Sequence, residues 1–285
     1  MLILYIILFI ITLISPDKSK DIILSTTTIF FNNLYPILFS SILLLDIINN
    51  NYYYQMILLK SYKFYNKIFH FNSPLTLSLI LISILLGSPS ATYIILNSIK
   101  NNLISEDEGY SIIYSFSSLS ISYTIYILRL NNINIFIYLS LNILFSFLLF
   151  KLNNNTNKNV IEYKPKKNKQ IAIIKESIIN TFKVLFTILG MCIFFSFIQS
   201  LIKFKKISPY IEIMTGLIEI NNINIISTLE KNIIIISSLT FSGISIIFQI
   251  IALNQDISII KLLKNKIIAS IAITLSFFLY YFIIT

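Results

Sequence analysis

The residues best suited to chemistry lie in three short polar breaks inside otherwise apolar segments of membrane length. These breaks are Gly87-Ser88-Pro89-Ser90, Glu212-Ile213-Met214-Thr215-Gly216 and Ser242-Gly243-Ile244-Ser245. Backbone that leaves the helix at membrane depth exposes N–H and C=O groups that lipid cannot satisfy, so such breaks persist only where protein or a wet cavity covers them. Broken helices in corresponding positions of two halves are typical of the binding site of a membrane carrier.

The chemistry that these breaks favour is the binding of an anion. A half-helix that begins at a break turns unpaired N–H groups and the positive end of its dipole into the protein. Hydroxyl groups flank two of the breaks, and more of them crowd the serine-rich segment 110–129. Each serine has an alternative role, because serines in membrane helices also bond to backbone carbonyls or let helices pack closely.

Two further side chains are candidates for contact with a substrate. Glu212 stands between apolar residues, and a carboxylate there is costly unless it faces a cavity or a partner, although Pro209 could instead place it near the headgroups. Gln249 could bind a ligand or join a neighbouring helix. The predicted substrate-binding residues are Gly87, Ser88, Pro89, Ser90, Ser117, Ser118, Glu212, Thr215, Gly216, Ser242, Gly243, Ser245 and Gln249.

Nothing in the sequence indicates an enzyme. His70 and Cys192 are the only residues of their types, and no paired carboxylates occur at metal-binding spacing. Neither a metal centre nor a nucleophile with its base can be assembled from them. We therefore expect no catalytic residue, no metal and no cofactor, and the sequence leaves the identity of a coupling ion open.

The composition is that of a polytopic membrane protein. Of 285 residues, 56% are hydrophobic and only 12% are charged, about half the charged share of a typical soluble domain. The chain has room for roughly eight to ten membrane segments. Its net charge of +10 lies mostly in loops beside these segments, where lysines mark cytoplasmic flanks. The expected partner is therefore the lipid bilayer, and no nucleic-acid role is expected.

The order of elements predicts an all-α membrane fold built from two inverted repeats with broken or re-entrant helices. We divide the chain into an N-terminal anchor helix and turn (1–21), a first membrane repeat (22–150), a basic cytoplasmic linker (151–170) and a second membrane repeat (171–285). Within 22–49, Pro36 is expected to interrupt the segment.

The positions of the loops constrain the number of membrane crossings. Lysines and tyrosines in 50–73 suit a helix at the cytoplasmic interface. If both 50–73 and 151–170 are cytoplasmic, the segments 74–100, 110–129 and 133–150 make an even number of crossings, so one of them does not span. The serine-rich 110–129 is the candidate for the re-entrant hairpin.

From about residue 22 to its end, the chain resembles the sporulation integral membrane protein YlbJ family, which is related to nucleoside-recognition Gate-domain proteins. Asn33-Leu34-Tyr35-Pro36 is similar to that family's Leu-Phe-Pro segment, and Gly87-Ser88-Pro89-Ser90-Ala91 to its Gly-Tyr-Pro-Ser-Gly. The other similar stretches are Asn102 to Glu108, Glu212 with Gly216, and Phe241-Ser242-Gly243-Ile244-Ser245 with Gln249. Ala91 and Ser242 replace family glycines, Met214 replaces a threonine, and Ser117-Ser118 with Ser122 replace Asn-Asn and a proline.

The resemblance implies a secondary-type carrier that moves dipicolinate, a small organic anion, across the outer forespore membrane of an endospore-forming bacterium. It implies a location in the mother cell, with other sporulation membrane proteins as partners. Two alternatives stay open. One is a non-transporting structural component of a sporulation membrane complex. The other is a nucleoside carrier, for which we expect more amide and acidic groups at the breaks to bind ribose hydroxyls.

Overall fold

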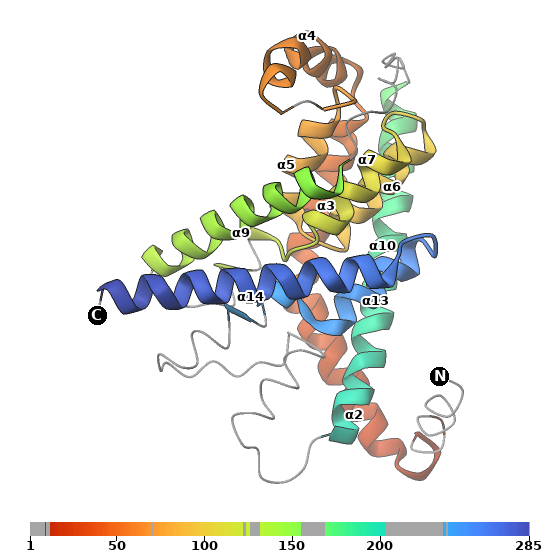
Figure 1. Ribbon diagram of the computed structural model, residues 1–285. Helices are drawn as coiled ribbons and strands as arrows, with labels where there is room; N and C mark the ends of the chain where they lie inside the picture. Colours follow the sequence, from red (N-terminus) through yellow and green to blue (C-terminus); the bar gives the residue numbers. More distant parts are fainter. Residues whose placement is uncertain are drawn as a thin grey trace.

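The computed structural model describes residues 9, 12–69, 71–121, 124–125, 132–154, 169–202, 236–237 and 239–284 (Figure 1). Glu212, Thr215 and Gly216 of the second polar break lie outside the described residues, as do residues 1–8, 10 and 11 of the N-terminal anchor and 155–168 of the basic linker. The described residues are helical apart from turns and one isolated antiparallel bridge between Gly87 and Leu119.

The first long helix is continuous through the predicted boundary at residues 21–22. It consists of α2 (Pro16–Ile29), the π-helical turn η1 (Phe30–Leu34) and α3 (Tyr35–Asn49). Pro16 suits the first turn because its missing N–H would have no helical partner there. Pro36 does not interrupt the helix: the chain widens into a π-turn just before it, in which the Tyr35 N–H donates to the Phe30 carbonyl.

Among the described residues, four helices are long and apolar enough to span a membrane: Pro16–Asn49, Ile135–Asn153, Gln170–Ser200 and Ile259–Tyr280. They belong to α2–α3, α9 (Asn132–Asn153), α10 (Gln170–Ile202) and α14 (Ile259–Ile284). Helix α10 packs along α2 and α3, while α14 packs along α9. Large apolar side chains such as Leu44, Phe186 and Ile271 are exposed on these helices, as expected of surfaces that face lipid. The prediction of an all-α membrane protein is confirmed at this level.

Helix α4 (Tyr52–Phe69) lies across one end of the bundle, at the top of Figure 1. It begins where Asn51 Oδ1 accepts the N–H groups of Tyr53 and Tyr54 at 2.9 and 3.4 Å, which is ordinary N-terminal capping. The tyrosine- and lysine-containing segment 50–73 therefore forms the predicted helix.

The segment that turns back on itself is 73–103. Helices α5 (Thr76–Leu86) and α6 (Ser90–Lys100) are joined by the first polar break. Their outer ends lie together, because the Ser73 hydroxyl donates to the Leu103 carbonyl at 2.8 Å and Leu75 and Leu103 pack with Leu58. The re-entrant hairpin that we expected in 110–129 stays a prediction, because part of that segment lies outside the described residues. Its described part is the end of α7 (Glu106–Ser115), a non-helical stretch at 116–120 and the helical residues 121 and 124–125.

Polar residues from several segments gather at the end of the bundle near α4. The Asn72 N–H donates to Glu108 Oε1 at 2.9 Å, and the Ser111 hydroxyl donates to the Asn153 carbonyl at 3.0 Å. We call this region the polar end; it comprises residues 49–55, 72–76, 98–108, 153–154 and 169–177. The hairpin thus leaves and returns at the polar end, and α9 ends there.

Helix α13 (Gly243–Leu253) begins within the third polar break and packs against α6, α10 and α14. The loop after it is joined to α7. The Asn254 amide donates to the Tyr110 hydroxyl at 3.2 Å, and the Ser258 N–H donates to the Tyr114 hydroxyl at 2.9 Å. These bonds place the start of α14 beside the end of α7.

Candidate functional site

The tip of the α5–α6 hairpin crosses the serine-rich stretch that follows α7. Gly87 closes α5 by donating its N–H to the Ser83 carbonyl at 2.9 Å, and it has φ +65°. It forms the bridge with Leu119, and the Ser88 N–H donates to the Ser118 carbonyl at 2.8 Å. The structure therefore brings the first polar break (87–90) together with the predicted residues Ser117 and Ser118. Backbone groups of the break are hydrogen-bonded there by protein, as a break inside a membrane requires.

The amide groups at the start of α6 are partly occupied by the break itself. The Ala91 N–H, in the first turn of α6, donates to the Gly87 carbonyl at 2.9 Å. Pro89 precedes α6, and its peptide bond with Ser88 is cis. The Ser88 and Thr92 hydroxyls are 3.4 Å apart. The Ser90 hydroxyl is buried without a hydrogen-bond partner, so it is the group at this break that has a bond left to offer.

A buried lysine lies at this crossing, and the sequence analysis missed it. Lys266, on α14, is only 3% exposed, and its ammonium group donates to the Ser117 carbonyl. Ser118 lines the same small cavity, with Asn142 and Ser146 of α9 on its wall. The full lining is Tyr114, Ser115, Ser117, Ser118, Asn142, Ser146, Leu149, Thr240, Asn265, Lys266 and Ala269.

The charge of Lys266 is not matched within this cavity. No acidic side chain is among the described residues that line it. A buried charge is costly unless it is paired and hydrogen-bonded, and an ionisable group inside a membrane span is by default a candidate for function. The cavity volume is only about 10 Å³, which is room for about one water molecule.

A periodic signal for Lys266 is present in the sequence. Leu262, Asn265, Lys266 and Ile273 are all buried, whereas Lys261 and Lys264 are exposed. The buried positions follow the spacing of one helical face. The continuous apolar run begins only after Lys266, which on composition alone would place the lysines of 261–266 in a flank. Helix α14 begins at Ile259 instead, so Lys266 lies on its inward face.

The third polar break overlaps the start of α13, and the backbone is left-handed at the first two residues of the break. Ser242 has φ 67° and Gly243 has φ 78°. The Ser242 hydroxyl donates to the carbonyls of Leu239 and Thr240 at 3.2 and 3.3 Å, so it closes the preceding turn. Thr240 lines the cavity of Lys266. The third break therefore lies next to the place where the hairpin tip crosses Ser117 and Ser118.

Gln249 joins two helices in this structure. Its amide nitrogen donates to the Ser245 hydroxyl at 3.1 Å and lies 3.7 Å from Cys192 Sγ on α10. Gln249 and Ser245 are both buried. Of the two roles that the sequence left open for Gln249, ligand binding or joining a neighbouring helix, these contacts correspond to the joining of helices.

Glu108 anchors the base of the hairpin at the polar end, outside the candidate spans. Ser105 caps α7 by accepting the Glu108 N–H at 3.3 Å, and the Glu108 carboxyl accepts the Asn72 N–H at 2.9 Å. The side chain is fully buried. Burial raises the pKa of the Glu108 carboxyl to about 7, against the lowering effect of the Asn72 N–H.

Comparison of the chain with protein-family models, with curated proteins and with solved structures gives no match.

Proposed function

We propose that this protein is a secondary-type membrane carrier of a small organic anion, which binds at Lys266 beside the crossed breaks. The observation that supports this most is the buried ammonium group of Lys266 in a cavity whose described lining holds no acidic side chain. A carboxylate of the substrate supplies the missing negative charge. The Ser90 hydroxyl at the hairpin tip and the Ser117–Ser118 backbone lie on the same crossing and position that carboxylate.

The dimensions of the hairpin fit a re-entrant element. Helices α5 and α6 are each 11 residues long, which at 1.5 Å per residue is about half of the 30 Å hydrocarbon core. Both outer ends lie at the polar end, so Gly87 reaches roughly the middle of the bilayer. With 74–100 as the segment that does not span, the segments between 50–73 and 151–170 make an even number of crossings, as two cytoplasmic loops require.

The packing pattern supports two inverted repeats. The long helix α2–α3 has its counterpart in α10, and α9 has its counterpart in α14. Each element packs against its counterpart, which is expected when a two-fold axis in the membrane plane relates the halves. The part of the second half that would match the α5–α6 hairpin contains Glu212, Thr215 and Gly216 and lies outside the described residues.

The cavity of Lys266 must open before a substrate can bind. Room for one water molecule excludes any organic anion, so the structure represents a closed form of the proposed carrier. Movement of the hairpin tip against α14 and α9 would expose Lys266 to one side of the membrane. Such rocking of one bundle around a fixed site is the common basis of alternating access.

We propose dipicolinate as the substrate and the outer forespore membrane as the location, on the strength of the resemblance to the YlbJ family. A flat dicarboxylate offers one carboxylate for Lys266 and a second for hydroxyls and backbone amides. A purely structural component has no evident use for a buried cation. A nucleoside carries no charge to match Lys266.

The decisive experiment is uptake of labelled dipicolinate and uridine into vesicles that contain the purified protein. Lys266→Met removes the charge at similar length, while Lys264→Met removes a charge from an exposed position of the same helix. We expect saturable dipicolinate uptake that falls at least tenfold in Lys266→Met and persists in Lys264→Met. Absence of uptake in the unchanged protein, equal loss in both variants, or uptake of uridine alone would reject the proposal.

A further inference from the structure

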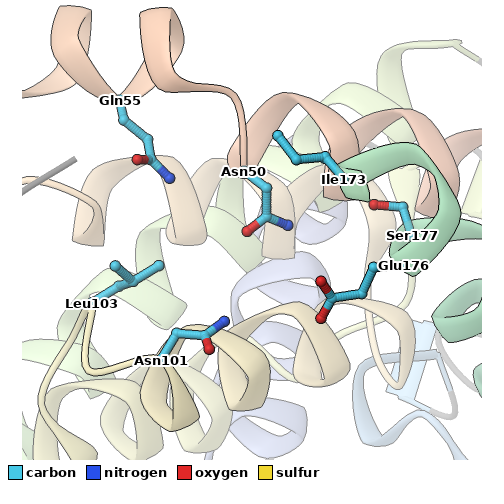
Figure 2. Close-up of a pocket in the computed structure, with 7 residues that line it drawn as sticks. All are labelled: Asn50, Gln55, Asn101, Leu103, Ile173, Glu176 and Ser177. Atoms are coloured by element: carbon cyan, nitrogen blue, oxygen red, sulfur yellow. The ribbon is translucent and has the colours of Figure 1, made fainter. Parts of the chain in front are cut away.

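A second polar cavity lies at the polar end, away from Lys266. Figure 2 shows its lining, which comes from the turn between α3 and α4, from the residues after α6 and from the start of α10. Its volume is about 250 Å³, enough for several water molecules. The lining residues are Asn50, Gln55, Asn101, Leu103, Ile173, Glu176 and Ser177.

The amides of this cavity have their nitrogen atoms committed elsewhere. Asn50 Nδ2 donates to the carbonyl and carboxylate oxygens of Asp46 at 2.9 and 3.0 Å. Gln55 Nε2 donates to the Asn49 carbonyl at 3.0 Å, and Asn101 Nδ2 donates to Asn97 Oδ1 at 3.4 Å. All three amide oxygens remain available to a ligand, beside one further N–H each on Gln55 and Asn101. Gln55 Oε1 in particular is buried without a hydrogen-bond partner, on a side chain that is 4% exposed.

Glu176 is the one charged side chain among the described residues that line the cavity. Figure 2 shows the Glu176 carboxylate and the amides of Asn50 and Asn101 turned toward one another. Behind them, the Asp46 carboxylate is 1% exposed and accepts hydrogen bonds from Asn50 and Ser177. No lysine or arginine is among the described residues that line the cavity. Lys100, Lys175 and Lys183 line a separate cavity that shares Glu176. An oxygen-rich lining with one carboxylate suits a cation.

We infer that this cavity binds an alkali cation of the Na⁺ or K⁺ class. Neutral amide oxygens with one lining carboxylate suit a monovalent ion, whereas Ca²⁺ sites collect more carboxylates and transition metals prefer His and Cys ligands. The described residues contain no cluster of such ligands. The cavity is larger than a bare ion, so the cation keeps part of its hydration shell and meets some ligands through water.

Within the proposed carrier this cation is the coupling ion. It sits where the α6 leg of the hairpin meets α10 and the end of α3, so its binding holds the hairpin against the long helix. The inference of a cation site does not itself require transport. It rests on the cavity, its free oxygens and its charge.

The test is the thermal stability of the purified protein in detergent, with NaCl or KCl replaced by choline chloride at constant ionic strength. Glu176→Gln removes the lining carboxylate, and Glu106→Gln removes an exposed carboxylate that does not line the cavity. A cation that binds only the folded protein raises the unfolding temperature with concentration. We expect this rise in the unchanged protein and in Glu106→Gln, and its loss in Glu176→Gln.

Equal unfolding temperatures in all three salts, or a rise that survives Glu176→Gln, would overturn the inference. Stabilisation by uridine without stabilisation by alkali salts would assign the cavity to a neutral polar solute and would also overturn it. The result of the salt-stability test can be distinguished from the result of the dipicolinate uptake assay. Salt stabilisation without dipicolinate uptake rejects the carrier and keeps the cation site, while uptake without salt stabilisation does the reverse.

Discussion

At the scale of single residues, buried polar groups with unsatisfied bonds locate the proposed substrate site. The Ser90 hydroxyl is 1% exposed and has no hydrogen-bond partner. A buried hydroxyl in this condition costs folding free energy and is explained if a substrate completes its bonding. Lys266 is buried in a cavity whose described lining holds no acidic side chain. Lys266 bonds to the serine-rich stretch at Ser117, and Ser90 begins α6 beside the hairpin tip that crosses this stretch.

Replacement of Ser90 by alanine separates binding from stability. We expect Ser90→Ala to leave the unfolding temperature of the substrate-free protein unchanged or raised, since an unpaired hydroxyl is removed. We expect it to weaken dipicolinate binding about fivefold, the worth of one hydrogen bond of about 1 kcal/mol. Ser83→Ala is the control, because the Ser83 hydroxyl is buried but donates within its own helix to the Leu79 carbonyl at 2.7 Å. Isothermal titration calorimetry that finds equal affinity in both variants would exclude Ser90 from the site.

Glu108 makes stability depend on pH. Its pKa is about 7 in the folded protein, against an ordinary value of 4.5, so the folded state binds the proton more tightly than the unfolded state does. The free energy of unfolding should therefore fall on the order of 3 kcal/mol as pH rises from about 4.5 through 7, and then level off. Glu108→Gln should remove this slope, while exposed Glu106→Gln should retain it. Thermal unfolding of the purified variants across pH 5 to 8 measures the effect, and an unchanged slope in Glu108→Gln would contradict it.

At the scale of elements, the hairpin depends on the approach of two backbones at Gly87. A Cβ on Gly87 would overlap the Ser120 amide nitrogen and lie 2.6 Å from the Leu119 carbonyl carbon. The backbone of Gly87 has φ +65° and ψ 178°, a conformation that is essentially restricted to glycine. The tip therefore cannot move aside to accept a side chain without losing the bridge to Leu119.

Two glycine substitutions test this close approach. Gly87→Ala should destabilise the protein by more than about 3 kcal/mol and abolish transport. Gly190→Ala is the matched control, because an added Cβ there meets nothing within 4 Å in the interior of α10. It should stabilise the protein by roughly 0.5–1 kcal/mol through helix propensity. Similar behaviour of the two variants in chemical unfolding would mean that the crossing does not hold the fold together.

Sequence patterns gave the elements more reliably than their spatial relations. Apolar length predicted the long spans, and the change of composition at 50–73 predicted α4. The first polar break was predicted because glycine, proline and serine stand together there. That the break makes a hairpin was not predictable, because either a broken crossing or a return could follow Gly87. Bonds far apart in the sequence, such as Ser73 with Leu103, decide it.

The site shows the same limit. The predicted groups at residues 87–90 and 117–118 do meet, through the Ser88 N–H and the Ser118 carbonyl. Lys266 was missed because a lysine at the start of an apolar helix usually lies at the interface, and only its helical spacing with Asn265 and Ile273 indicates otherwise. The amide cavity was also missed. Asparagine is so frequent in this chain that Asn50 and Asn101 carried no signal until the fold placed them with Glu176.

At the scale of the whole molecule, the proposed topology places the polar end on one side of the membrane. The interfacial helix α4, the base of the hairpin and the start of α10 all lie there, and they carry Lys60, Glu106 and Lys169 as exposed residues. A hairpin that enters and leaves on the same side requires these positions to share that side. A broken segment that crosses would place Glu106 opposite Lys60. The two arrangements differ in the membrane face from which position 106 is accessible, which chemical labelling measures directly.

The last prediction uses single cysteines in a Cys192→Ser background. Cys192 is the chain's only cysteine, so Lys60→Cys, Glu106→Cys and Lys169→Cys each give one reactive thiol. In vesicles of known orientation, a membrane-impermeant maleimide should label all three from the same face, and the positive-inside rule makes that face cytoplasmic. Helix α10 leaves the polar end and crosses the bilayer, so Ser200→Cys near its far end should react from the opposite face. Labelling of Glu106→Cys together with Ser200→Cys, rather than with Lys60→Cys, would show that 74–100 spans the membrane and would remove the re-entrant hairpin on which the inverted-repeat carrier depends.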